Sequence, residues 1–189
     1  MYKLIIFGPP GVGKGTQAEL LSQKMNLFHF STGNYLRDLT LRDTELGKKV
    51  KNILDRGELV PDDVMNEIIS DALRNNIKDK GFILDGYPRT VNQAIALDDI
   101  LKSLNLQDII IIYLNVNDEE ILKRLLLRGR SDDSEEIIKK RLIIYKETTS
   151  KVLDYYKENG KKIIEINGIG EINEINENII SEIMKNIKF

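Results

Sequence analysis

The chain has 189 residues and an almost balanced charge, with 28 lysines and arginines against 30 aspartates and glutamates. This length predicts a single domain, and a composition with 41% hydrophobic and 31% charged residues is typical of a globular protein. Cysteine is absent, which excludes disulfides, a thiol nucleophile and a zinc site built from cysteines. Histidine occurs once, which excludes a metal site built from several histidines. The balanced charge argues against a nucleic-acid coat or a membrane-surface protein, since both depend on excess positive charge.

The apolar stretch at residues 1–7 is too short for a signal peptide and runs directly into glycines. The longest later apolar run, residues 109–114, is far below the roughly 20 residues that a membrane-spanning helix needs. We therefore expect a cytoplasmic protein with neither a membrane nor a nucleic acid as its partner.

Five short runs rich in β-branched and aromatic residues predict strands at residues 3–7, 27–30, 82–84, 109–114 and 162–166. Most of these runs are continuously apolar, which is typical of strands covered on both faces. Segments with helical periodicity lie between and after them, at residues 17–25, 64–73, 92–101, 121–125, 137–155 and 170–185. Strands that alternate with helices predict an α/β fold with a parallel sheet between helical layers.

Three helix starts carry capping or charge signals. Asn117 has a glutamate three residues later, and Asp133 has one at the same distance, which is the spacing of a capping box. Asp62 and Asp63 follow Pro61 and place negative charge at the positive end of the next helix. These residues predict where three helices begin.

The strongest motif is the glycine-rich segment at residues 8–16, which reads Gly-Pro-Pro-Gly-Val-Gly-Lys-Gly-Thr. It follows a predicted strand and precedes a predicted helix, as a phosphate-binding loop does. Its glycines allow successive N–H groups to point at one anion, and the helix that follows adds its positive dipole end. Lys14 would supply a charge to the β- and γ-phosphates, and Thr16 a hydroxyl to Mg²⁺ or a phosphate. Gly15 departs from the general pattern, in which the lysine is followed at once by serine or threonine.

A phosphate loop predicts a nucleotide but not a reaction. A kinase for small molecules or nucleotides, a GTPase switch and a non-catalytic nucleotide-binding module all remain open. The Asn-Lys-x-Asp string with which GTPases read guanine does not occur, which weighs against the switch.

A second polar segment, Asp85-Gly-Tyr-Pro-Arg89-Thr, leaves the predicted strand at 82–84. Ligands of open α/β sheets gather at the carboxyl ends of the strands, so Asp85 could hold Mg²⁺ through water and Arg89 could bind a phosphate. The single histidine, His29, is interpreted as a structural residue near a strand end.

Arginines recur in several segments: Arg37, Arg89, Arg124, Arg128, Arg130 and Arg141. Each alone could be a solvated surface residue. As a set beside a phosphate loop they favour a cationic clamp, because phosphoryl transfer is catalysed mainly by positioning and by fixed positive charge. The planar guanidinium grips phosphate with two hydrogen bonds and keeps its charge.

These strings together resemble adenylate kinase in its short-lid form, over essentially the whole chain. The resemblance rests on residues 8–17, Ser-Thr-Gly-Asn-Tyr-Leu-Arg at 31–37, Gly-Glu-Leu-Val-Pro-Asp at 57–62, residues 85–90 with Gln93, residues 124–133 and Lys-Arg-Leu at 140–142. Gly15 is this family's own variant of the loop. The resemblance implies a P-loop NTPase-type five-stranded parallel sheet, with a small helical AMP-binding flap and a short lid loop. It also implies the reaction of ATP with AMP to give two ADP, with Mg²⁺.

The resemblance also implies residue roles. ATP binding falls to Gly11, Val12, Gly13, Lys14, Gly15, Thr16, Arg124, Arg128 and Gly170. AMP binding falls to Thr32, Gly33, Arg37, Glu58, Leu59, Val60, Gly86, Tyr87, Pro88, Arg89, Gln93, Arg130 and Arg141. The catalytic set around the transferred phosphoryl group is Lys14, Arg37, Arg89, Arg128, Arg130 and Arg141. Thr16 and Asp85 would hold Mg²⁺, Asp85 through water.

Within one kinase domain, the resemblance implies a core of residues 1–30, 61–126 and 134–189, a flap of 31–60 and a lid of 127–133. The lid is too short for the inserted domain of long-lid relatives, and without cysteine no zinc is expected. Asn34 stands where the family usually has aspartate. The expected partners are ATP, AMP and ADP, and the expected oligomeric state is a monomer.

Thr32 and Gln93 favour AMP, since the similar UMP/CMP kinases tend to have alanine and asparagine at these positions. A glutamine amide offers one donor and one acceptor to the adenine edge. UMP/CMP kinase activity remains the alternative within the family.

Overall fold

The computed structural model describes residues 1–77, 80–128 and 134–186, without the side chain of Arg128. Its centre is one parallel sheet with the strand order β2-β3-β1-β4-β5. The strands are β1 (Lys3–Phe7), β2 (Phe28–Ser31), β3 (Phe82–Asp85), β4 (Ile110–Asn115) and β5 (Lys162–Asn167). All five predicted strands are confirmed, with ends that differ by one residue at most. The predicted fold class is confirmed as well.

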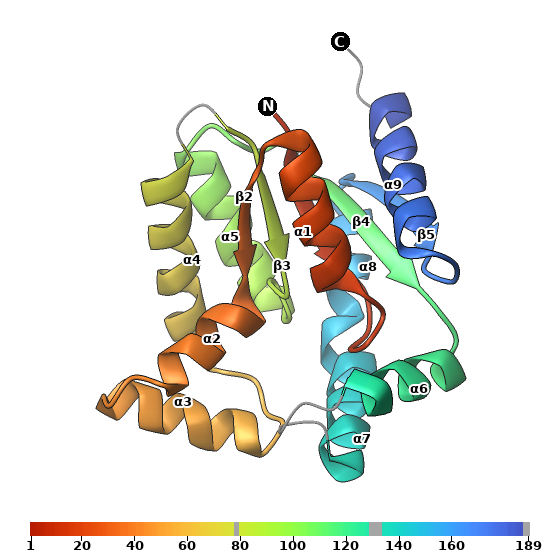
Figure 1. Ribbon diagram of the computed structural model, residues 1–189. Coiled ribbons are helices and arrows are strands. Elements are labelled where there is room, and N and C mark those ends of the chain that lie inside the picture. Colours follow the sequence, from red (N-terminus) through yellow and green to blue (C-terminus); the bar gives the residue numbers. More distant parts are fainter. Residues whose placement is uncertain (78–79, 129–133, 187–189) are drawn as a thin grey trace.

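Helices cover both faces of this sheet (Figure 1). They are α1 (Lys14–Met25), α2 (Thr32–Thr40), α3 (Glu45–Asp55), α4 (Asp62–Asn76), α5 (Val91–Ser103), α6 (Asp118–Arg128), α7 (Glu135–Ile144), α8 (Lys151–Glu158) and α9 (Ile172–Asn186). A π-helical turn, η1 (Tyr145–Thr149), interrupts the apolar stripe that predicted one continuous helix from 137 to 155.

The core lies in two layers because successive residues of a strand point to opposite faces. Ile5 and Phe7 of β1 pack in the layer that includes α4, α5 and α8. Leu4 and Ile6 pack in the layer that includes α1 and α9. All four side chains are at most 4% exposed, which explains why the strand sequences are continuously apolar.

Two of the predicted helix starts are confirmed and one is wrong. The backbone N–H of Glu120 donates to Asn117 Oδ1 at 2.9 Å, and α4 begins at Asp62. The N-cap of α7 is Ser134, whose Oγ accepts from the Ile137 N–H at 3.3 Å, and not Asp133, which lies outside the described residues. The capping-box spacing favoured Asp133, but serine caps a helix as well as aspartate does and needs no glutamate three residues later.

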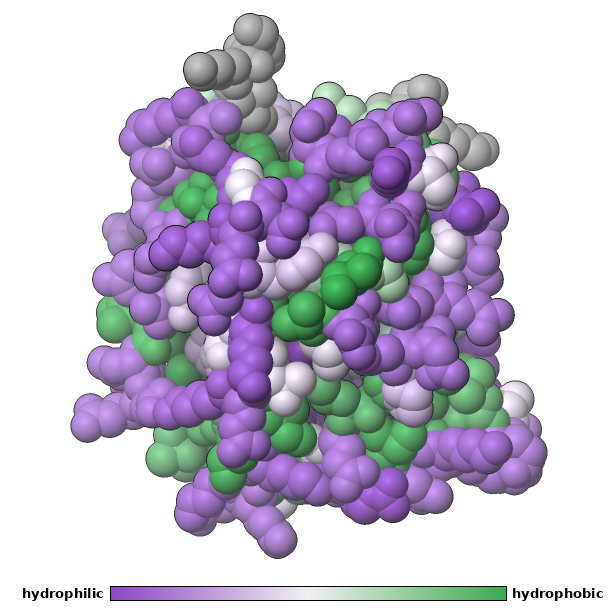
Figure 2. Space-filling model, turned by 180° about the vertical axis from the view of Figure 1, so that it is seen from behind, coloured by the Kyte–Doolittle hydropathy of each residue, from purple (hydrophilic) through white to green (hydrophobic). Residues whose placement is uncertain are grey.

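The carboxyl ends of the strands point to one edge of the sheet, where two pairs of helices extend beyond it (Figure 1). Helices α2 and α3 lie on one side of this edge, and α6 and α7 on the other. On the face of the molecule seen in Figure 2, hydrophilic residues predominate and hydrophobic ones emerge between them in patches. None of the helices in the described ranges is both long and apolar enough to cross a membrane.

Candidate nucleotide-binding site

A cleft of about 940 Å³ opens at the carboxyl edge of the sheet. Its walls come from the glycine-rich loop after β1, the segment after β3, helix α2, the end of α3 and helices α6 and α7. In an open α/β sheet this is the edge at which ligands bind.

Glycines shape the loop at residues 8–16 by allowing backbone angles that other residues avoid. Gly8, Gly11 and Gly13 have φ angles of 143°, 82° and 103°. A Cβ atom on Gly8 would lie 2.4 Å from the Leu114 carbonyl oxygen, and one on Gly11 would lie 2.6 Å from Leu125 Cγ. The loop therefore packs directly against β4 and α6, with no room for side chains.

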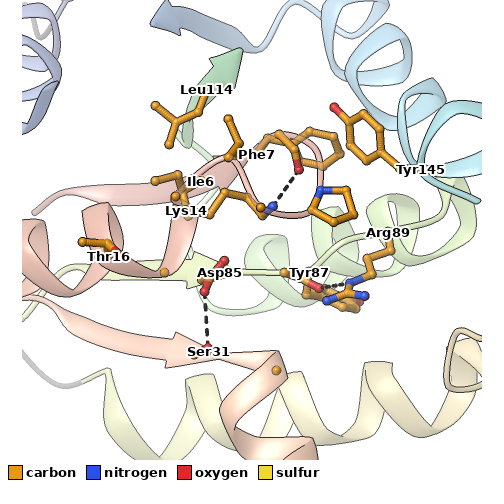
Figure 3. Close-up of a pocket in the computed structure, with 18 of the residues that line it drawn as sticks. Ile6, Phe7, Lys14, Thr16, Ser31, Asp85, Tyr87, Arg89, Leu114 and Tyr145 are labelled. Atoms are coloured by element: carbon orange, nitrogen blue, oxygen red, sulfur yellow. Dashed lines mark hydrogen bonds between the residues drawn. The ribbon is translucent and has the colours of Figure 1, made fainter. Parts of the chain in front are cut away.

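Helix α1 begins at Lys14, immediately after the loop, so its first N–H groups and positive dipole end lie at the cleft. The Lys14 ammonium group donates to the carbonyl oxygens of Gly8 and Pro9, at 2.7 and 2.8 Å. Figure 3 shows the lysine folded back over its own loop in this way. The charge is thus held beside the backbone donors where a phosphate chain would bind.

Arg124 ties helix α6 to the same loop. Its Nε donates to Glu120 Oε1 at 2.6 Å and its Nη1 donates to the Val12 carbonyl oxygen at 3.2 Å. Glu120 thereby orients an arginine of the cleft, a role that sequence reasoning missed although the two residues have the i, i+4 spacing of a helical ion pair.

Asp85 ends β3 with a carboxylate that is 9% exposed and faces the phosphate loop. Its Oδ2 accepts a hydrogen bond from Ser31 Oγ at 3.3 Å (Figure 3) and would lie 3.3 Å from a Cβ built on Gly15. Sequence reasoning missed Ser31 as an Asp85 partner. The signal was the strand register, because Ser31 pairs with Asp85 across β2 and β3.

The cleft offers a magnesium ion only a few protein ligands. Thr16 and Asp85 both line the cleft and offer a hydroxyl and a carboxylate, the hard oxygen ligands that Mg²⁺ prefers. The described residues include no group of three or more histidines, aspartates or glutamates suited to a metal ion. The remaining positions would then go to phosphate oxygens and water, which is usual for magnesium with nucleotides.

Three arginines from different elements line the cleft and lie near enough to interact: Arg37 from α2, Arg89 from the segment after β3, and Arg141 from α7. Burial lowers the pKa of Arg89, the Asp85 carboxylate opposes this, and the positive charges of Arg141 and Arg37 lower the pKa further. The Arg89 Nε donates to the Gly86 carbonyl oxygen at 2.7 Å (Figure 3). Because guanidinium groups stay protonated, this cluster favours a multiply charged anion.

Asn34, which stands where the family usually has aspartate, makes a polar contact with Arg37. Asn34 Oδ1 accepts a hydrogen bond from Arg37 Nη2 at 2.6 Å, as an aspartate oxygen could. Asparagine therefore supports the orientation of Arg37 while leaving out one negative charge.

A smaller pocket adjoins the cleft and shares Leu36, Gly86 and Arg89 with it. Thr32 lines it and is 2% exposed, and its hydroxyl has no hydrogen-bond partner within the described ranges. Gln93 also lines it and is 2% exposed. Its side-chain amide already has two partners, Asp62 and the Arg89 N–H. The volume of this pocket is about 20 Å³, so a base would enter only if the helices around it move apart.

Most of the predicted site residues come together in these two spaces. The cleft is lined by Gly11, Val12, Gly13, Lys14, Gly15, Thr16, Gly33, Arg37, Glu58, Leu59, Asp85, Gly86, Tyr87, Pro88, Arg89, Arg124, Arg141 and Gly170. The smaller pocket adds Thr32, Val60 and Gln93. Of the predicted lid at 127–133, residues 129–133, with Arg130 among them, and the side chain of Arg128 lie outside what is described.

The family model described as adenylate kinase matches residues 6–161. Relatives named adenylate kinase include one from Prochlorococcus marinus (strain MIT 9515), 48% identical over 93% of this chain and 95% of its own. Another, from Leptospira biflexa (strain Patoc 1 / Ames), is 46% identical over 97% of this chain and its full length. A third, from Flavobacterium psychrophilum, is 43% identical over 99% of this chain and its full length. With its phosphate loop and arginines in one cleft, the chain belongs to the adenylate kinase family of phosphotransferases.

Proposed function

We propose that this chain catalyses the reversible, Mg²⁺-dependent transfer of a phosphoryl group from ATP to AMP, giving two ADP, and so balances the adenine nucleotides. One observation carries the proposal: the phosphate loop, the segment after β3 and three arginines, Arg37, Arg89 and Arg141, all line a single cleft. Phosphoryl transfer needs donor and acceptor in line with fixed positive charge around the moving group.

The donor side is assigned to the loop, where the N–H groups of residues 11–16 would surround the ATP phosphates. Lys14 would leave its two carbonyl partners for phosphate oxygens, since a charge-assisted bond is stronger than a bond to a neutral carbonyl. Arg124, held by Glu120 and Val12, would stack on the ATP base, with the Gly170 backbone nearby. Arg128 would contact the phosphates.

The acceptor side is assigned to the segment after β3 together with α2 and the end of α3. Thr32, whose buried hydroxyl lacks a protein partner in the described ranges, would bond to AMP. Backbone groups of residues 33, 58–60 and 86–88 would surround the nucleotide, and Gln93 would face the base. Arg37, Arg89, Arg130 and Arg141 would bind the phosphate of AMP and the group in transfer.

Thr16 and Asp85 would hold Mg²⁺, Asp85 through water. The ion would neutralise phosphate charge as it builds up during transfer. Ser31, by donating to Asp85 Oδ2, would keep the carboxylate turned toward the loop.

Two segments would move around a fixed core of residues 1–30, 61–126 and 134–189. The flap, residues 31–60, comprises α2 and α3, and the lid is residues 127–133. Closure of both would exclude water from the transfer and suppress ATP hydrolysis. Because both nucleotide sites are assigned to one chain, a monomer suffices, and the cytoplasm supplies its substrates.

The test is a coupled assay of ADP formation by the purified protein with ATP and AMP, CMP, UMP or GMP. The proposal expects ADP with AMP at a kcat/KM at least about tenfold above that for CMP or UMP, because Thr32 and Gln93 favour the adenine base. Preference for CMP or UMP would identify a UMP/CMP kinase. Nucleotide binding without ADP formation would identify a binding module, and GTP hydrolysis without any monophosphate a GTPase.

A further inference from the structure

The carboxylate of Asp62 accepts a hydrogen bond at each oxygen, one from Gln93 of helix α5 and one from Thr90, the N-cap of that helix. Gln93 Nε2 donates to Oδ1 at 2.8 Å, and Thr90 Oγ1 donates to Oδ2 at 2.9 Å. Asp62 is the first residue of α4, and Gln93 lies in the first turn of α5. The side chain thus joins the starts of two helices through residues that are 31 positions apart in the sequence.

Gln93 is held between a group that only accepts hydrogen bonds and a group that only donates them. Its Nε2 faces the Asp62 carboxylate, and its Oε1 accepts from the Arg89 N–H at 2.7 Å. A flipped amide would set an oxygen against the carboxylate and an NH₂ group against the N–H, losing both bonds. The side chain is 2% exposed, so water cannot replace these partners freely.

The backbone of Gln93 is fixed by the same network. Thr90 Oγ1, which donates to Asp62, accepts from the Gln93 N–H at 3.1 Å. The Tyr87 hydroxyl lies 3.1 Å from the Gln93 carbonyl oxygen and 2.7 Å from Asn66 Oδ1. Asp62 therefore acts on the position of Gln93 through two routes, its own bond and the Thr90 hydroxyl.

This arrangement leaves Gln93 one N–H and one oxygen lone pair, in an order that cannot reverse. The residue lines the small pocket between Thr32, Val60 and Met65. A 6-aminopurine presents a donor at its 6 position and an acceptor at N1, whereas a 6-oxopurine presents the opposite order. A fixed amide can match only one of the two.

We propose that Asp62 is a positioning residue for base specificity: by holding the Gln93 amide in one orientation, it makes the acceptor site select 6-aminopurine over 6-oxopurine monophosphates. The inference rests on the proposed function, since it assigns the base of the acceptor nucleotide to this pocket. It adds a residue that does not itself touch the nucleotide.

The experiment compares kcat/KM for AMP, IMP and GMP at saturating ATP in the wild type and in Asp62→Asn, Asp62→Glu and Asp63→Asn. IMP is also titrated as a competitor of AMP, so that its affinity is measured where its turnover is slow. Asparagine keeps the shape of Asp62 but offers an NH₂ group as well as an oxygen, whereas glutamate remains acceptor-only. Asp63→Asn removes the same charge from an exposed neighbour in the same helical turn.

We expect Asp62→Asn to reduce the preference for AMP over IMP by about tenfold, since a site that rejects a substrate through its hydrogen-bond order loses discrimination when that order is no longer fixed. Asp62→Glu and Asp63→Asn should keep the preference within about twofold to threefold. The KM for ATP should stay within about twofold in all variants, since the ATP site is assigned to the phosphate loop and Arg124 and not to this pocket. A ratio of two substrates does not depend on the fraction of folded enzyme, so a less stable variant remains informative.

An unchanged preference in Asp62→Asn, or an equal loss in Asp62→Glu, would overturn the positioning role. Either result could occur while the wild type still converts AMP to ADP. A wild type that forms no ADP from AMP would instead overturn the proposed function, and the inference with it.

Discussion

Glu58 and Lys140 form an ion pair, with 3.0 Å between Oε1 and Nζ, although 82 residues separate them in the sequence. The other Glu58 oxygen accepts from Arg56 Nε at 3.1 Å, and the hydrogen bond from Lys140 is the main reason that the pKa of Glu58 is lowered. Lys140 precedes Arg141 on α7. The pair therefore links the segment proposed to bind AMP to the helix that brings Arg141 into the cleft.

We expect Lys140→Ala and Glu58→Gln each to raise the KM for AMP by roughly two- to fivefold at low salt, as suits an exposed ion pair. In a double-mutant cycle the free-energy effects of the two substitutions on the KM for AMP should not be additive. The increase in KM should be smaller at about 1 M salt, because salt screens the ion pair. Lys139→Ala is the matched control, because Lys139 pairs with Glu135 within α7. If Lys140→Ala has no greater effect than Lys139→Ala, the link has no role in AMP binding.

Lys14→Met should reduce the forward rate by at least about 10³-fold while the protein stays folded. The fixed cation beside the β- and γ-phosphates would be lost, and such charges contribute most of the stabilisation in phosphoryl transfer. The rate is measured at saturating substrates and the melting temperature is recorded alongside. A loss below tenfold in a protein of native melting temperature would contradict the role of Lys14.

Gln93→Leu should lower kcat/KM for AMP by about 10- to 100-fold, because unmatched buried hydrogen-bonding groups cost roughly 1–3 kcal/mol. The Asp62 oxygen and the Arg89 N–H also lose a partner, so the melting temperature should fall. The KM for ATP should change little. A larger effect on ATP than on AMP would mean that the two nucleotide pockets are assigned the wrong way round, and no effect on either would make Gln93 a purely structural residue.

Gly8→Ala should destabilise the protein by about 2–4 kcal/mol, since the residue has a positive φ and its Cβ would lie 2.4 Å from a carbonyl oxygen of β4. Gly160→Ala is the control. Gly160 has a φ of 67° but open space around its Cβ position, so only the backbone cost of about 1 kcal/mol remains. Urea unfolding of both variants measures the difference, and equal losses would show that the close approach to β4 is not the cause.

Burial lowers the pKa of His29 below its ordinary value of 6.5, an effect that Asp85 and Glu19 partly oppose. The unfolded chain therefore binds a proton more readily than the folded one, and the free energy of unfolding should fall as the pH drops below about 6.5. His29→Gln should flatten this slope between pH 7.5 and 5.5. Because the chain has one histidine, the variant removes the only imidazole. Parallel stability curves for the two proteins would rule out a contribution from His29.

The sequence by itself determined the sheet, the phosphate loop and the family. Strands buried on both faces need continuous apolar runs, which are visible without a structure, and a loop that surrounds phosphate needs glycines at fixed spacing before a helix. Glutamate four residues before Arg124 was also visible, although its role at the cleft was not recognised. Each of these signals lies within a short stretch of chain.

Only the tertiary structure decided the partners of side chains that are distant in sequence. Asp62 has the same sequence signal as Asp63, an acid in the first turn of a helix, yet the packing of α4 beside α5 turns Asp62 toward Gln93 and leaves Asp63 exposed. Glu58 likewise meets Lys140 only because the segment after α3 lies against α7, where a Cβ on Gly57 would be 3.2 Å from Ile137 Cγ2. A local pattern fixes which residues share a helix face, whereas the contact between two helices depends on how the whole sheet positions them.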